Sequence, residues 1–160
     1  TFVGVKKRQE ERGEVGGVLV IDDYAHHPTA IRETVDALRA RYPGRRLWAV
    51  YEPKSNTARR NVHQVEYARA FDSADRVVFA RPFVKRDAFG DDERLDTERL
   101  VAELRGRGVD ATYLPSVDAT LAHLLASVLP GDVVAFMSSS GFEGIHDRLL
   151  AGLRASASDA

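Results

Sequence analysis

The sequence contains no cysteine among its 160 residues. This absence excludes a disulfide-stabilised scaffold, a thiolate metal site and a cysteine nucleophile. The sequence also lacks any apolar run approaching the roughly 20 residues that a helix needs to cross a bilayer. Neither sign of charge dominates, because 23 Lys and Arg residues face 24 Asp and Glu residues. The composition therefore gives no electrostatic reason to expect nucleic acid or an anionic membrane as a partner.

Two phosphate-binding motifs are absent as well. The chain has no G-x-x-x-x-G-K-[ST] loop and no G-x-G-x-x-G fingerprint. A nucleotide-binding enzyme that works alone is therefore not indicated. Residues such as Arg8, Tyr24 and His26 are still able to flank a base or phosphate in a site built mostly elsewhere.

What is present is the pattern of a single α/β domain. Short apolar runs alternate with segments of helical periodicity, which predicts a mostly parallel, Rossmann-like sheet with helices on both faces. The charged segment 3–14 precedes the first run and predicts an N-terminal β-hairpin. The predicted strands are 18–21, 45–53, 75–83, 109–115 and 131–141, and the predicted helices are 28–42, 62–71, 95–107, 117–128 and 144–153. Residues 155–160 read as a disordered tail.

Polar side chains follow three of the predicted strands. They are "DDYAHHP" at 22–28, "EPKSNTARR" at 52–60 and "SSSGFEGIH" at 138–146. In sheets of this kind ligands bind outside the carboxyl ends of the strands. The sequence therefore predicts a binding cleft at this edge.

Metal binding and hydrolysis are two chemistries that these residues suggest. Asp22, Asp23, His26 and His27 are competent ligands for a divalent ion, but adjacent acids on a strand diverge and no distant ligand set is evident. Asp22, His26 and the serines 138–140 supply the residue types of a hydrolase triad. However, the G-x-S-x-G nucleophile elbow is missing.

A receiver-like signalling or binding module is an alternative of a different class. The acid pair Asp22–Asp23 resembles the magnesium-binding acids of a phosphoacceptor domain. The acceptor Asp after the third strand and the Lys-Pro after the fifth are absent, so the pattern fails where it is most specific.

Structural roles remain open for several of these residues. Asp22 or Asp23 would cap the turn before Pro28. Trp48 and Phe136 belong to apolar strands and are expected in the core. The residues that also fit a solvated surface are His27, Arg59, Arg60, Arg86, Asp87, Asp91 and Asp92.

Three stretches together resemble the C-terminal domain of the Mur ligase family. They are "FVGVKKRQEERGEVGGVLVIDDYAHHPTAI" at 2–31, "WAVYEPKSNTARR" at 48–60 and "FMSSSGFEGIHDRLL" at 136–150. The resemblance covers essentially the whole chain. It implies that residues 1–154 form the closing, lid-like domain of a three-domain enzyme. The UDP-sugar domain and the central ATPase domain, which carries the P-loop, would lie outside this chain.

The resemblance also implies a reaction. Enzymes of this family use ATP to phosphorylate a muramoyl carboxylate, and an incoming amine then attacks the acyl phosphate. The second and third stretches favour the member that joins the tripeptide L-Ala-γ-D-Glu-meso-diaminopimelate to UDP-N-acetylmuramate during peptidoglycan recycling. The first stretch alone also fits the member that adds L-alanine. The implied enzyme is a cytoplasmic ligase for cell-wall synthesis whose Mg²⁺ is held mainly by the central domain, and the isolated C-terminal domain is expected to be inactive.

Residue roles follow from the resemblance position by position. It implies no catalytic residue and no metal ligand in this domain. The implied nucleotide contacts are Arg8, Asp22, Asp23, Tyr24 and His26. The implied substrate contacts are His27, Lys54, Ser55, Asn56, Arg59, Ser139, Ser140 and Gly141.

Overall fold

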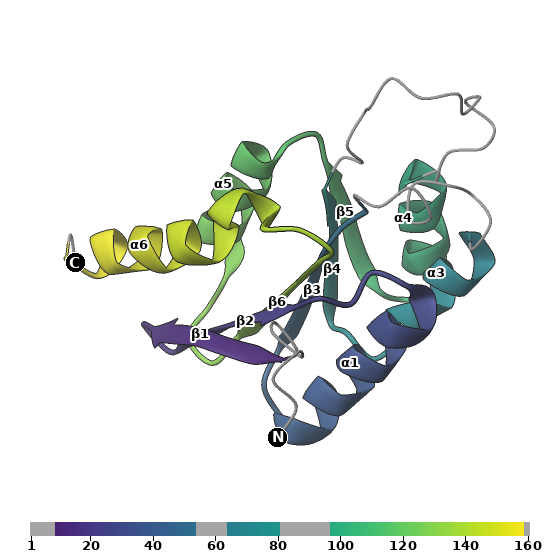
Figure 1. Cartoon of the computed structure of the whole chain (residues 1–160), viewed down its shortest axis with the longest axis horizontal. Coiled ribbons are helices and arrows are strands. Elements are labelled where there is room, and N and C mark those ends of the chain that lie inside the picture. Colours follow the sequence, from purple (N-terminus) through teal and green to yellow (C-terminus); the bar gives the residue numbers. More distant parts are fainter. Residues whose placement is uncertain (1–8, 54–63, 81–96, 159–160) are drawn as a thin grey trace.

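The computed structural model describes residues 9–53, 64–80 and 97–158, and these form one six-stranded sheet flanked by helices (Figure 1). The strand order is β1-β2-β6-β3-β4-β5. The strands are β1 Glu10–Val15, β2 Val18–Asp23, β3 Leu47–Glu52, β4 Arg76–Ala80, β5 Asp110–Leu114 and β6 Val133–Ser138.

Strand direction confirms the predicted mostly parallel sheet with its N-terminal hairpin. Strands β2, β6, β3, β4 and β5 pair in parallel, and β1 pairs antiparallel with β2. The hairpin turns at Gly16 and Gly17, whose φ angles are +60° and +81°. Glycine adopts such angles readily because it has no Cβ.

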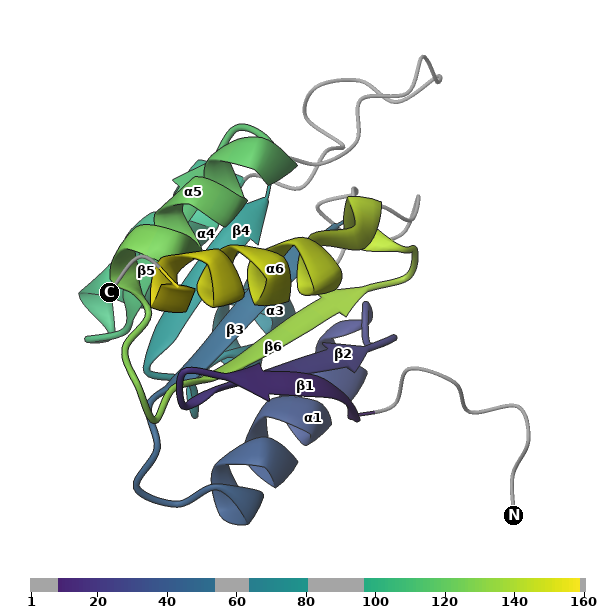
Figure 2. The same ribbon diagram turned by 90° about the vertical axis from the view of Figure 1, so that its left-hand side faces the viewer.

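Helices cover both faces of the sheet, as the sequence predicts (Figures 1 and 2). One face carries α1 Pro28–Arg41, α3 Gln64–Ala70 and α4 Thr97–Gly106, and the other carries α5 Val117–Ser127 and α6 Ile145–Ser158. A short 3₁₀ turn, η3 Phe142–Gly144, connects β6 to α6.

Each face of the sheet has its own apolar core. Leu19 and Ile21 of β2 pack in the cluster beneath α1, whereas Val18 and Val20 pack in the cluster beneath α6. Side chains alternate between faces along a strand. The two acids that end β2 therefore extend to opposite sides of the sheet. Trp48 and Phe136 are 1% and 0% exposed, which confirms both as core residues.

The C-terminal segment corrects one expectation. Residues 155–160 read as a disordered tail, but α6 continues to Ser158, so 155–158 are helical. The physical reason is composition, because Ala155 and Ala157 have the highest intrinsic helix propensity and extend a helix already anchored upstream.

Candidate functional site at the carboxyl edge of the sheet

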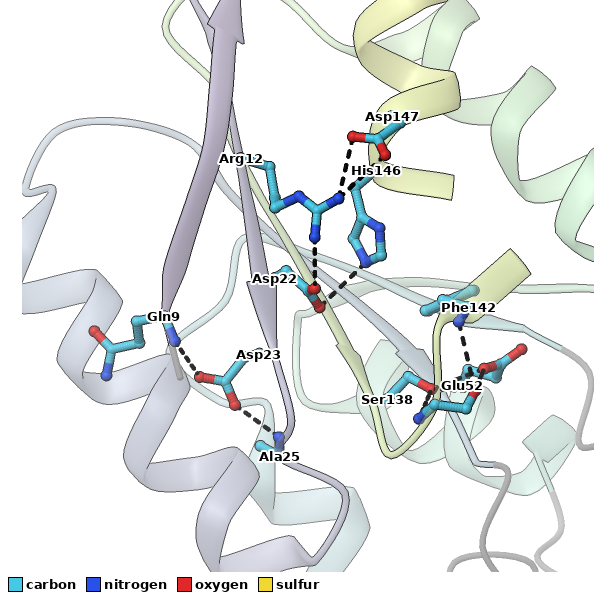
Figure 3. Close-up of polar contacts among 11 residues, drawn as sticks. Gln9, Arg12, Asp22, Asp23, Ala25, Glu52, Ser138, Phe142, His146 and Asp147 are labelled. Carbon is cyan, nitrogen blue, oxygen red and sulfur yellow. Dashed lines mark hydrogen bonds and ion pairs between the residues drawn. The ribbon is translucent and has the colours of Figure 1, made fainter. Parts of the chain in front are cut away.

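Three adjacent strands bring the predicted polar segments together at one edge. In the parallel register Asp23 of β2 lies beside Met137 of β6, and Glu52 of β3 lies beside Ser138 of β6. Figure 3 shows the polar contacts that result. The polar segments that the sequence places at strand ends therefore share one edge, where β2, β6 and β3 end.

Asp23 caps the start of the loop that follows β2. Its Oδ1 accepts a hydrogen bond from the Ala25 N–H at 2.7 Å and another from the Thr34 hydroxyl at 3.4 Å. Its Oδ2 accepts from the Gln9 N–H at 2.8 Å, just before β1 (Figure 3). The residue is 2% exposed, so the carboxylate acts inside the protein as the turn cap that was one of its two predicted roles.

Asp22 points to the opposite side of the sheet and is 1% exposed. Its Oδ2 lies 3.4 Å from Nη1 of Arg12, and its Oδ1 lies 3.1 Å from Nε2 of His146. Arg12 in turn binds both carboxylate oxygens of Asp147 at 3.1 and 3.2 Å (Figure 3). This cluster ties β1, β2 and the first turn of α6 to one another.

His146 is unusual within that cluster. The side chain is buried, and within the described residues neither ring nitrogen has a partner in hydrogen-bonding geometry. The approach to Asp22 is close enough for an ion pair but is not aligned for a hydrogen bond. The ring also packs edge-on against Phe136, with centroids 5.4 Å apart.

Tyr24 and His26 form the accessible surface of the loop after β2. Tyr24 is 50% exposed, and its ring meets the His26 ring edge-on with centroids 5.1 Å apart. The His26 Nδ1 lies 3.0 Å from the Tyr24 carbonyl oxygen. The exposed Tyr24 ring can offer one face to a planar ligand.

Two buried tyrosines form hydrogen bonds to the loop after β2. The His26 carbonyl oxygen accepts hydrogen bonds from the Tyr51 hydroxyl at 2.9 Å and the Tyr67 hydroxyl at 2.7 Å. The two rings stack with centroids 5.6 Å apart. Burial raises the pKa of Tyr67, and it raises the pKa of Tyr51 well above its ordinary value. Both hydroxyls therefore remain protonated donors, and the loop position is fixed by β3 and α3.

His27 begins the helix after the loop. It is the N-cap of α1, where its Nδ1 accepts from the Thr29 N–H at 3.4 Å, and Pro28 follows as the first helical residue.

Glu52 organises the other half of the edge. Its Oε1 accepts from the Ser138 hydroxyl at 2.8 Å and from the Ser140 hydroxyl at 3.1 Å. The Ser138 Oγ accepts from the Ser140 N–H at 3.0 Å, and the Ser140 Oγ accepts from the Phe142 N–H at 3.4 Å. Glu52 is only 5% exposed. The sequence analysis includes Glu52 in the polar segment 52–60 but assigns it no contact, although a glutamate that ends an apolar strand signals a polar partner.

The turn after β6 has an uncommon backbone. Phe142, Glu143 and Gly144 have φ angles of +51°, +49° and +68°. Two of these residues carry a Cβ, and such angles cost non-glycine residues roughly 1 kcal/mol or more each. Surrounding contacts must hold the turn, since Phe142 is fully buried against Phe136.

The remaining predicted contacts divide into two groups. Ser139 is partly exposed and Gly141 is exposed, and both lie in the turn after β6. Arg8, Lys54, Ser55, Asn56 and Arg59 lie outside the described residues.

The contacts also bear on the metal and hydrolase interpretations. Within the described ranges, no group of three or more His, Asp or Glu side chains is placed to hold a metal ion. The Ser138 and Ser140 hydroxyls donate to Glu52, whereas His26 contacts the Tyr24 carbonyl. The hydrogen bonds of the described residues therefore do not join serine, histidine and aspartate in a triad. None of the described helices is both long and apolar enough to cross a membrane.

Comparison with known proteins identifies the family. Residues 7–140 match the family described as "Mur ligase, glutamate ligase domain". The chain belongs to the Mur ligase family. This confirms the resemblance read from the sequence, and it replaces the receiver-like interpretation.

The similar curated relatives of this Mur ligase domain include two kinds of ligase. A UDP-N-acetylmuramate–L-alanyl-γ-D-glutamyl-meso-2,6-diaminoheptandioate ligase from Haemophilus influenzae is 36% identical over 156 residues, which cover 96% of this chain and 32% of the relative. A UDP-N-acetylmuramate–L-alanine ligase from Desulfitobacterium hafniense is 36% identical over 136 residues, which cover 83% of this chain and 29% of the relative.

A solved structure agrees with the fold. The murein peptide ligase from Psychrobacter arcticus matches with a TM-score of 0.78 and 36% identity, over 95% of this chain and 31% of that one. The chain thus spans about a third of the length of the relatives it matches.

Proposed function

We propose that this chain is the closing domain of an ATP-dependent amide ligase of peptidoglycan synthesis. The proposed enzyme joins L-Ala-γ-D-Glu-meso-diaminopimelate to UDP-N-acetylmuramate. One observation carries the proposal: the polar ends of β2, β3 and β6 meet at one edge of a Mur ligase domain. The 36% identity to a tripeptide ligase across 96% of the chain supports this substrate.

The enzyme's other parts follow from the same proposal. A UDP-sugar domain and an ATPase domain would complete the protein, and the ATPase domain would hold the P-loop and most of the Mg²⁺ ligands. Residues 1–154 would act as the lid, and alone they would not catalyse the reaction. Because ATP and a nucleotide sugar are the proposed substrates, the proposed location is the cytoplasm.

The nucleotide side of the proposed cleft is the loop after β2. The exposed Tyr24 ring and the partly exposed His26 ring suit packing against an adenine base. Asp22 and Asp23 have their carboxylates engaged inside the protein. We propose that Asp22 and Asp23 serve the nucleotide side by shaping the loop after β2. To bind ribose directly, either carboxylate would have to give up one of its present contacts. Arg8 is proposed to reach the phosphates.

The peptide side is the pair of segments that follow β3 and β6. Charged and amide side chains suit a tripeptide that carries several carboxylates. The proposed peptide contacts are His27, Lys54, Ser55, Asn56, Arg59, Ser139, Ser140 and Gly141. Figure 3 shows Ser138 and Phe142 on this side, apart from Asp22 and Asp23 on the other.

The reaction explains why a lid needs both sides. The muramoyl carboxylate takes the γ-phosphoryl group of ATP, and the peptide amine then displaces phosphate from the acyl phosphate. Water would hydrolyse that intermediate, so closure protects it and aligns the amine for attack. A domain with one nucleotide surface and one peptide surface brings both reactants under the same lid.

L-Alanine is the second candidate for the incoming substrate. The similarity to an L-alanine ligase, 36% over 136 residues, supports it directly. Free L-alanine offers one carboxylate, whereas the tripeptide offers several. A cleft with several cationic and amide contacts therefore favours the tripeptide.

The test is the Michaelis constant of the full-length ligase for each substrate. Lys54→Ala and Arg59→Ala should each raise KM for the tripeptide about ten- to a hundred-fold, the effect of losing roughly 1.5–3 kcal/mol of charge-assisted contact. KM for ATP and for UDP-N-acetylmuramate should stay near wild type. Arg32→Ala is a matched control, because this side chain is 70% exposed on α1. Unchanged tripeptide kinetics in both variants would show that the segment after β3 does not hold the peptide.

A further inference from the structure

We propose that Glu52 is a positioning residue that orders the turn after β6. The inference rests on the proposed function, because this turn is one of the segments assigned to the tripeptide. Glu52 is the last residue of β3. Its carboxylate oxygen simultaneously binds the turn that follows β6.

The direction of each hydrogen bond shows what Glu52 does. A serine hydroxyl has one proton and can accept through its lone pairs. With Oε1 of Glu52 accepting from Ser138 and Ser140, both hydroxyl protons point toward the carboxylate. Both oxygens then present lone pairs to backbone donors, the N–H groups of Ser140 and Phe142. One buried acceptor therefore orients two hydroxyls and, through them, two backbone amides.

One of those amides, that of Phe142, belongs to the strained part of the chain. The Phe142 N–H lies at the first of three consecutive residues with positive φ. Without an acceptor at position 52, the two hydroxyls lose the common acceptor that orients them, and the turn loses part of the network that balances its strain. The exposed Gly141, which is proposed to meet the peptide, lies between Ser140 and Phe142 and would move with them.

Charge is not the property that this network needs. In the described part of the chain, Glu52 accepts from two neutral hydroxyls. A glutamine places a carbonyl oxygen at the same position and still accepts both bonds. Glu52→Gln should therefore keep the network, whereas Glu52→Ala should lose it. Comparing the two variants distinguishes a Glu52 that positions the turn after β6 from a Glu52 that binds the substrate through its charge.

The first test uses the 160-residue chain. Amide proton exchange measured by NMR should speed up about tenfold or more at Ser140 and Phe142 in Glu52→Ala, while amides of β4 and β5 keep wild-type protection. Glu52→Gln should resemble wild type. Should exchange at Ser140 and Phe142 stay unchanged in Glu52→Ala, the network does not depend on Glu52 and the inference is wrong. This readout does not depend on the identity of the substrate.

The second test uses the full-length ligase. Glu52→Ala should raise KM for the tripeptide about ten- to a hundred-fold, because a small displacement of binding groups has effects of this size. KM for ATP should not change, and Glu52→Gln should restore tripeptide KM. Asp132→Asn is the matched control, since this acid is also buried but lies at the opposite edge of the sheet. It should leave tripeptide KM unchanged.

The outcomes separate the two proposals. Equal losses in Glu52→Gln and Glu52→Ala would mean that charge matters, and an equal loss in Asp132→Asn would mean that general stability matters. Either result overturns the positioning role. A wild-type enzyme that does not use the tripeptide overturns the proposed function instead, and the exchange experiment still decides the role of Glu52.

Discussion

Asp132 shows how a single buried acid is stabilised at the edge of the sheet away from the site. Its carboxylate accepts from Arg46 at 2.8 and 3.0 Å, from the Trp48 indole at 2.9 Å and from the Leu129 N–H at 2.9 Å. Burial alone would raise the pKa of Asp132, but these hydrogen bonds outweigh it and the pKa is lowered. The acid therefore stays ionised and joins the starts of β3 and β6.

This pKa shift predicts a pH dependence of stability. A lowered folded-state pKa stabilises the protein above the unfolded value of about 3.9, and the contribution is lost as pH falls through the folded value. Asp132→Asn should reduce the free energy of unfolding by about 2–3 kcal/mol at pH 7. Urea denaturation of both proteins at several pH values measures this difference, which should shrink below pH 4. A difference that is constant down to pH 2.5 would contradict the assignment.

The two tyrosines beneath the loop after β2 predict a non-additive pair of substitutions. After Tyr51→Phe or Tyr67→Phe alone, the His26 carbonyl still has one hydroxyl donor. Each single substitution should therefore lower the unfolding free energy by about 1 kcal/mol. The double substitution removes both hydroxyl donors from this carbonyl. Its loss of unfolding free energy should exceed the sum of the two single losses by about 1–2 kcal/mol. Chemical denaturation of the four proteins measures the coupling. Strict additivity would mean that the hydroxyls do not share this acceptor in solution.

At the scale of elements, the β1–β2 hairpin is fastened to the rest of the sheet at its turn. The Gly17 carbonyl accepts from the Gly131 N–H at 2.8 Å and from Arg45 at 3.0 Å. A Cβ on Gly17 would lie 3.2 Å from backbone atoms of Gly131 and Pro130, whereas a Cβ on Gly16 would meet nothing within 4 Å. The two glycines share a left-handed backbone but differ in their surroundings.

That difference gives a matched pair of variants. Gly16→Ala should cost about 1–2 kcal/mol, the price of a left-handed backbone for alanine. Gly17→Ala should cost more, because the added methyl group also presses on the turn before β6. Thermal or urea unfolding of the two variants measures the comparison. Equal destabilisation would show that the turn can move away from β6 without loss.

At the scale of the whole molecule, the fold follows from the sequence more directly than the site does. Apolar runs such as Val18–Ile21 are buried on both faces, and they predict a central parallel strand before any contact is known. The sequence also places the acid pair at the strand end. It does not reveal that Asp22 meets His146, because that contact depends on how α6 packs across β2, 124 positions later in the chain.

The sequence therefore predicts that these polar strand ends share one edge of the sheet, but not which polar side chains meet there. The sequence places Glu52 in the polar segment 52–60 but gives it no individual role, because its two serine partners are set by the register of β3 beside β6. Asp23 was assigned to nucleotide and to a turn cap, and the structure shows the cap. Local pattern specifies which elements form, whereas tertiary packing decides which polar side chains face one another.

The most direct test of the proposed function is the substrate preference of the full-length ligase that contains this chain. The enzyme would be supplied with ATP and UDP-N-acetylmuramate, together with either the tripeptide L-Ala-γ-D-Glu-meso-diaminopimelate or free L-alanine. Phosphate release and the ligated product would be followed for each. The proposal predicts a kcat/KM for the tripeptide at least about a hundred-fold above that for L-alanine, as expected when several charged contacts distinguish two substrates. Preference for L-alanine, or no ligation with either, would contradict it.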